Sequence, residues 1–129
     1  MQSEIQKGHF IEYATVHGYT YGTSFSSVDE VINNNRVCIL DIDVQGVQNV
    51  MEKVSNATYV LILPPSIEEL SKRLRLRDTD SKEAIQLRLK NSQEEIRTAL
   101  ALPFTSVIVN NELNTAYQEL KQSIQHLLV

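Results

Sequence analysis

The stretch Val37–Gly46, with the sequence VCILDIDVQG, constrains the fold more than any other part of the chain. Its opening run, Val37 to Asp41, is apolar up to the closing carboxylate, which predicts a buried strand. Gly46 is expected to let the chain turn into a helix. In open α/β sheets, sites form outside the carboxyl ends of the strands. Asp41 and Asp43 are therefore candidate site residues; the alternative for an Asp at such a point is a helix cap or a turn residue.

Apolar periodicity along the rest of the chain alternates between strand and helix patterns. We expect a β-hairpin from His9–His17 and Tyr19–Thr23, a strand at Thr58–Leu63 and a short strand at Ser106–Val109. Helices are predicted after a capping box at Ser27, after Gly46, after the capping serines Ser66 and Ser81, and along Ala116 to Leu127. This alternation is typical of a parallel sheet covered by helices.

Length and charge narrow the class of protein. A chain of 129 residues is expected to form one domain. The net charge of −4 argues against nucleic acid as a partner. The sequence has neither an apolar run of membrane-spanning length nor a signal-peptide pattern, which predicts no membrane association. The single cysteine, Cys38, is expected to be buried and allows no internal disulfide, which fits a cytoplasmic protein.

Three arginines form the first candidate group. Arg73 and Arg77 lie four residues apart and share a helix face, and Arg88 lies on the next predicted helix. Positioned guanidinium groups can neutralise a phosphoryl group during transfer, and the break at Asp78–Asp80 would be the tip of a mobile lid. The alternative is a solvated basic face that complements the helix dipole.

Glu12, Tyr21 and Thr23 form the second candidate group, on the predicted hairpin. A carboxylate can accept hydrogen bonds from both N1–H and the 2-amino group of guanine, and adenine lacks this pair of donors. Tyr and Thr hydroxyls can hold a monophosphate without adding charge. The alternative for Glu12 is an ordinary surface residue. The histidines, His9, His17 and His126, have no partners at metal-ligand spacing, so no protein-bound metal site is predicted.

Four segments of the chain resemble successive motifs of guanylate kinases, in the family's order and with its spacing. They are FIEYATVHGYTYGTS (Phe10–Ser24), CILDIDVQGV (Cys38–Val47), LILPPSIEELSKRLRLRDTDS (Leu61–Ser81) and VIVNNEL (Val107–Leu113). The resemblance implies an α/β fold like that of P-loop nucleoside monophosphate kinases, a parallel sheet with helices on both faces. It divides the chain into a small β insertion for GMP (1–35), core (36–65), helical lid (66–100) and core (101–129).

The resemblance also implies an activity, the transfer of the γ-phosphoryl group of ATP to GMP with Mg²⁺ as cofactor. For GMP it implies Glu12 on the guanine base, Tyr21 and Thr23 on the phosphate, and Asp43 nearby. For phosphoryl transfer it implies Arg73, Arg77, Arg88 and Asp41, and for ATP it implies Arg73, Arg77 and Asn110. These residues are expected to converge on one pocket.

The sequence departs from the family pattern in one major respect, because it contains no Gly-x-x-x-x-Gly-Lys-Ser/Thr phosphate-binding loop. We therefore expect a truncated family member that lacks the P-loop strand between the strands of Asp41 and Leu61, and that alone is inactive or very weak. Unpaired strand edges are expected to recruit a second copy of the chain. Two alternatives stay open: a naturally truncated relative that keeps nucleotide binding, and an interaction module that uses the GMP cleft for a phosphopeptide or partner.

Overall fold

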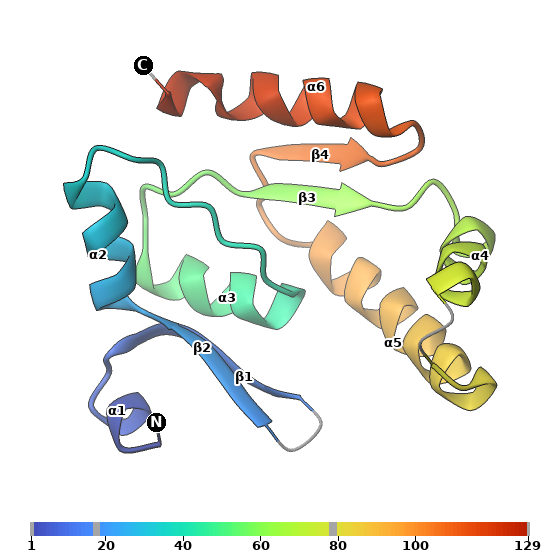
Figure 1. Cartoon of the computed structure of the whole chain (residues 1–129), viewed down its shortest axis with the longest axis horizontal. Coiled ribbons are helices and arrows are strands. Elements are labelled where there is room, and N and C mark those ends of the chain that lie inside the picture. The colour runs from blue at the N-terminus through green and yellow to red at the C-terminus, as the bar shows by residue number, and fades with distance from the viewer. Residues whose placement is uncertain (1, 17–18, 78–79, 129) are drawn as a thin grey trace. The chain divides into compact units, whose positions relative to one another are not determined.

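The computed structural model describes residues 2–16, 19–77 and 80–128 (Figure 1). Its contacts divide the chain into two compact units, the first centred on residues 2–57 and the second on residues 58–127. The first contains α1 (Gln2–Gln6), β1 (Phe10–Val16), β2 (Tyr19–Ser24), α2 (Phe25–Asn33) and α3 (Val44–Lys53). The second contains β3 (Val60–Leu63), α4 (Ile67–Arg77), α5 (Lys82–Leu100), β4 (Ser106–Val109), α6 (Leu113–Ile124) and a final 3-10 turn, η1 (Gln125–Leu127).

The predicted hairpin is confirmed, with β1 and β2 antiparallel; its predicted turn, residues 17–18, lies outside the described residues. The register shifts between Phe10, which pairs with Ser24, and Glu12, which pairs with Thr23. Ile11 is therefore an extra residue in a β-bulge. Strict alternation would place Ile11 and Glu12 on opposite faces, but both are buried, at 4% and 7% exposure.

Helix α3 packs against β1, so that the hairpin and this helix form the centre of the first unit. Its apolar stripe is as predicted, and Val50 is its most buried large side chain, at 4% exposure. The helix begins earlier than predicted because Asp43 caps it: Oδ1 of Asp43 accepts a hydrogen bond of 2.8 Å from the backbone N–H of Gly46. The helix-cap alternative is thus correct for Asp43, and Gly46 lies within the first turn. Near the other end of α3, Nζ of Lys53 donates to the carbonyl of Phe10 at 3.0 Å.

The prediction that Ser27 caps a helix is wrong, because α2 starts directly at the end of β2. Ser24, still in an extended conformation, is the N-cap, and its Oγ accepts from the backbone N–H of Ser27 at 3.1 Å. A cap must have a non-helical backbone, and Ser27 already belongs to the first turn.

The predicted buried strand at Val37–Asp41 is also wrong for the described structure. The segment is not assigned to a strand and pairs with neither two-stranded sheet. Ile39 is 73% exposed and Cys38 only partly buried. A strand exists through hydrogen bonds to a neighbour, and among the described residues no strand lies alongside this segment to accept them.

The second unit has the predicted parallel arrangement. Strand β3 pairs in parallel with β4, with Leu61 opposite Val107 and Ile62 opposite Ile108. The connection runs through α4 and α5, as a parallel crossover requires. Their predicted caps are confirmed, because Oγ of Ser66 accepts from Glu69 N–H at 3.0 Å and Oγ of Ser81 from Ala84 N–H at 3.1 Å.

Helix α6 packs on β4, and the buried residues of the second unit lie on β3, α5, β4 and α6. Its buried apolar residues are Leu61, Ile85, Ala99, Ile108 and Ala116. Each strand of this sheet keeps one edge that no described strand occupies. Assembly through those edges stays a prediction. Among the described residues, no helix has both the length and the apolarity that crossing a bilayer demands.

Candidate functional site

Glu12 and Thr23 form the polar centre of the first unit. They face each other across the hairpin, and Oγ1 of Thr23 donates a hydrogen bond of 2.8 Å to Oε1 of Glu12. The bulge at Ile11 turns Glu12 into this position, where it is the buried charged side chain of the described core. A buried carboxylate is costly unless hydrogen-bonded, so the Thr23 hydroxyl stabilises Glu12 in one orientation.

The other oxygen of Glu12 faces the first turn of α3. A Cβ atom built on Gly46 would lie 3.1 Å from Glu12 Oε2, and the same position would be 3.3 Å from Oδ1 of Asp43. The N-terminal turn of a helix favours negative charge. Gly46 therefore links two of the predicted GMP residues, Glu12 and Asp43, within one small region.

Tyr21 lies on the same face of the hairpin as Thr23, because side chains two residues apart on a strand point to the same side. Its side chain is 60% exposed, and its ring lies 6.5 Å from that of Tyr19, centroid to centroid. The Tyr21 side chain is thus accessible to a ligand. Of the predicted GMP residues, Glu12, Thr23 and Asp43 lie close together in the first unit, and Tyr21 lies on the same hairpin face as Thr23.

Asp41 is exposed in the unassigned segment before α3. In phosphoryl-transfer sites, Mg²⁺ is typically held by one or two carboxylates together with substrate phosphates. The described residues contain no cluster of three or more His, Cys, Asp or Glu side chains that could hold a metal ion by themselves. Asp41 is an exposed carboxylate of the kind that could serve an ion arriving with a nucleotide.

Arg73 makes three side-chain hydrogen bonds. Its Nη1 donates to the carbonyl of Asn110 at 2.9 Å, its Nη2 to the carbonyl of Asn111 at 3.4 Å, and its Nε to Oε1 of Glu69 at 3.1 Å. The two carbonyls follow β4, at the carboxyl edge of the parallel sheet, where α/β folds bind ligands. The structure thus joins two of the predicted ATP-binding residues, Arg73 and Asn110. Sequence reasoning missed Glu69, although its spacing of four residues from Arg73 is typical of a helical ion pair.

Of the other two arginines, one is exposed and one forms an ion pair. Arg77 is exposed at the end of α4, and Nε of Arg88 forms an ion pair of 3.2 Å with Oδ2 of Asp80. The predicted lid tip falls partly outside the described residues, since these include Asp80 but not residues 78–79. All three arginines belong to the second unit and Glu12 to the first, so their convergence on one pocket stays a prediction.

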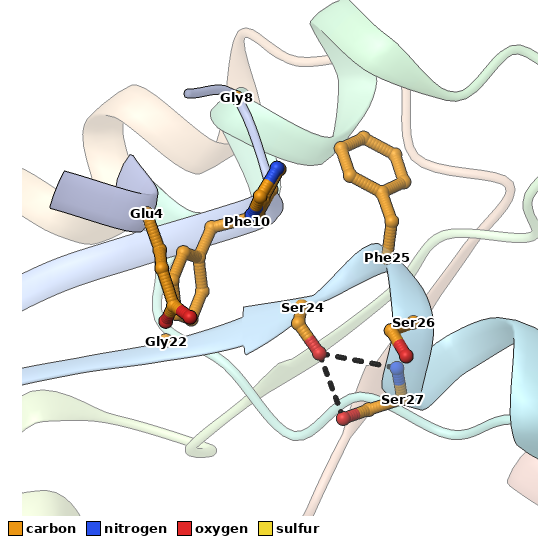
Figure 2. Close-up of a pocket in the computed structure, with 9 residues that line it drawn as sticks. Glu4, Gly8, Phe10, Gly22, Ser24, Phe25, Ser26 and Ser27 are labelled. Atoms are coloured by element: carbon orange, nitrogen blue, oxygen red, sulfur yellow. Dashed lines mark hydrogen bonds between the residues drawn. The ribbon is translucent and has the colours of Figure 1, made fainter. Parts of the chain in front are cut away.

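A hollow of about 630 Å³ lies on the other face of the hairpin (Figure 2). Phe10, Gly22 and Ser24 line it together with Glu4 and Phe25. Gly22 and Ser24 alternate along β2 with the residues that face Glu12. The hollow is therefore separate from the Glu12 site.

The parallel sheet with its helical crossover, the inserted hairpin and the arginine-bearing helices define the class of the molecule. The fold is like that of P-loop nucleoside monophosphate kinases. The crystal structure of guanylate kinase from Anaplasma phagocytophilum matches 99% of this chain with a TM-score of 0.71 and 27% sequence identity, over 61% of that chain's length.

The family model for guanylate kinase matches residues 1–127. The chain is 43% identical to guanylate kinase 1 of Arabidopsis thaliana, over 94% of this chain and 32% of the relative. It is 41% identical to guanylate kinase of Myxococcus xanthus, over 95% and 58%, and 39% identical to that of Homo sapiens, over 96% and 64%. The chain belongs to the guanylate kinase family, and it spans between 32% and 64% of the length of these relatives.

Proposed function

We propose that the protein to which this chain belongs transfers the γ-phosphoryl group of ATP to GMP, and that this chain recognises GMP through Glu12. The observation that carries the proposal is the fixed, buried Glu12 carboxylate, bonded to Thr23 at 2.8 Å beside the first turn of α3. Family membership supports the choice of nucleotide.

The hydrogen-bonding capacity of Glu12 matches guanine. An ionised carboxylate offers about four lone-pair sites, and the Thr23 hydroxyl uses one of them. The remaining sites can accept both N1–H and the 2-amino group of guanine. Adenine presents an acceptor at N1 and no 2-amino group, so it would leave the remaining acceptor sites of Glu12 without partners at a considerable free-energy cost.

The other residues of the first unit complete the GMP site. Tyr21, exposed on the same hairpin face, is assigned to the phosphate, because its hydroxyl can donate to a phosphate oxygen. The predicted phosphate role of Thr23 conflicts with its hydrogen bond in this structure, because the single hydroxyl proton of Thr23 is donated to Glu12. Asp43 and Glu12 both lie beside Gly46, and Asp43 caps the start of α3.

The second unit supplies the residues for ATP and for transfer. Arg73 and Asn110, which are hydrogen-bonded, are assigned to the ATP side, with Arg77. Arg77 and Arg88, both exposed, are assigned to the transferring phosphate, whose charge guanidinium groups stabilise. Asp41 is the residue that would hold Mg²⁺, which when bound would supply neutralisation of the phosphate charge.

The 129-residue polypeptide by itself is proposed to bind GMP weakly and to turn over very poorly or not at all. Its sequence contains no glycine-rich loop with the lysine that holds the β- and γ-phosphates of ATP. A coupled ADP-release assay with GMP, ATP and Mg²⁺ tests this part. Turnover at about 1 s⁻¹ or faster, within the ordinary range of kinases, would contradict it.

Calorimetry with GMP and AMP tests the recognition of guanine. We expect the chain to bind GMP measurably and AMP at least about a hundredfold more weakly. Glu12→Gln should abolish measurable GMP binding, because an amide replaces an acceptor by a donor opposite guanine. Glu119→Gln, the same change at an exposed position of α6, is the control and should bind GMP like the unmodified chain. Equal binding of GMP and AMP would remove Glu12 from this role.

A further inference from the structure

Gly46 lies so close to Glu12 that any larger residue at position 46 would contact the Glu12 carboxylate. It is buried in the first turn of α3, and a Cβ atom there would lie 3.1 Å from Oε2 of Glu12, 3.2 Å from Cβ of Ile42 and 3.3 Å from Oδ1 of Asp43. All three separations are shorter than ordinary van der Waals contact. An added methyl group would therefore displace at least one neighbour.

The backbone gives no reason for glycine at this position. Among the described glycines, only Gly8 has a positive φ, at 76°. In the interior of a helix, alanine is favoured over glycine. Conformational preference alone would thus select alanine at position 46, and the remaining explanation is space.

Of the three neighbours, Glu12 is the one that would move. The Cβ of Ile42 is fixed by the main chain, and Oδ1 of Asp43 is held by its hydrogen bond of 2.8 Å to the N–H of Gly46 itself. The Glu12 carboxylate is the end of a flexible side chain, but its other oxygen accepts from Thr23 at 2.8 Å. Displacing Oε2 would therefore turn the carboxylate away from the orientation that Thr23 sets.

We propose that Gly46 is a positioning residue for guanine specificity: the missing side chain at this helix position leaves the space in which the Glu12 carboxylate is held. The inference rests on the proposed GMP recognition and extends it to a residue that does not itself touch the nucleotide. Because Gly46 acts through Glu12, its replacement should affect the part of the nucleotide that Glu12 reads, and spare the rest.

Gly46→Ala, titrated with GMP and with inosine 5′-monophosphate, tests the specificity claim. Inosine monophosphate keeps N1–H but lacks the 2-amino group, so the ratio of the two affinities reports on the Glu12 contact. We expect Gly46→Ala to weaken GMP binding about tenfold, the equivalent of one misplaced hydrogen bond to a charged group. The preference for GMP over inosine monophosphate should therefore decrease. Gln48→Ala, on an exposed position of the same helix, should leave both affinities unchanged. An equal loss for both nucleotides, or no loss, would overturn the proposal.

Thermal unfolding without ligand tests the space claim separately. In the Glu12→Ala background the carboxylate is gone, and only the contacts with Ile42 and Asp43 oppose the gain in helix propensity from Gly46→Ala. In the unmodified background the Glu12 contact is added, so the same substitution should shift the unfolding temperature to a lower value than it does in the Glu12→Ala background. Equal shifts in both backgrounds would overturn the claim that Gly46 makes room for Glu12. If instead the unmodified chain binds GMP and inosine monophosphate equally, the guanine role of Glu12 fails, whatever the unfolding shifts show.

Discussion

The hydrogen bond between Thr23 and Glu12 can be removed by a substitution that keeps the side chain at position 23 almost the same shape. Thr23→Val replaces a hydroxyl by a methyl group on a side chain that keeps its β-branch and its preference for a strand. The substitution leaves Oε1 of Glu12 without its 2.8 Å donor, in a residue only 7% exposed. It therefore measures what this one donor contributes to the stability of the hairpin.

The expected cost follows from burial and charge. A hydrogen bond to an ionised group contributes about 1.5–3 kcal/mol, and a buried acceptor left unsatisfied loses a similar amount. We expect Thr23→Val to lower the free energy of unfolding by about 2 kcal/mol. For a chain of this size, that corresponds to a fall of about 6–10 °C in unfolding temperature. GMP affinity should fall too, because the carboxylate is no longer held in one orientation.

Urea unfolding followed by circular dichroism measures this effect, and the hairpin offers a matched control. Thr20 also forms a side-chain hydrogen bond, to Oγ1 of Thr15 at 3.2 Å, but that pair is exposed. Water replaces the lost partner at an exposed position, so Thr20→Val should change the free energy of unfolding by less than about 0.5 kcal/mol. Equal effects of Thr23→Val and Thr20→Val would refute the reasoning that Thr23 compensates the buried charge of Glu12.

Two further predictions concern the second unit. Arg73→Lys should lower the free energy of unfolding by about 1 kcal/mol, because an ammonium cannot reproduce the planar contacts of the guanidinium with the Asn110 carbonyl and its neighbours. Arg75→Lys, the same change at an exposed position of the same helix, is the control in urea unfolding. Equal effects of the two substitutions would contradict this prediction. The pKa of Glu112 lies below its ordinary value of 4.5, first because Glu112 accepts a hydrogen bond from the backbone N–H of Thr115 and second because it accepts one from the Thr115 hydroxyl. Ionised Glu112 therefore stabilises the folded state fully above pH 4.5, and this stabilisation is lost as the pH falls through the lowered pKa. Glu112→Gln should therefore flatten the acid side of the stability curve, measured by unfolding between about pH 3 and pH 6, and parallel curves for the two proteins would be inconsistent with the cap.

The sequence by itself determined the features that depend on residues close together along the chain. The caps Ser66 and Ser81 were predicted correctly because a helix cap is made by a side chain and a backbone N–H only three residues apart. The hairpin and the parallel pair β3–β4 followed from β-branched runs and the helical crossover between them. Family membership was also readable, since the motifs occur as linear segments.

Tertiary structure decided whatever depends on a partner distant in sequence. Val37–Asp41 has the composition of a strand but lacks a neighbouring strand among the described residues, and a strand is defined by that neighbour. The bulge at Ile11, the contact of Arg73 with Asn110 and the closeness of Gly46 to Glu12 likewise join separate segments. The sequence pattern indicates which face of an element is apolar. Packing decides which atoms of different elements come into contact, and the candidate site consists of such contacts.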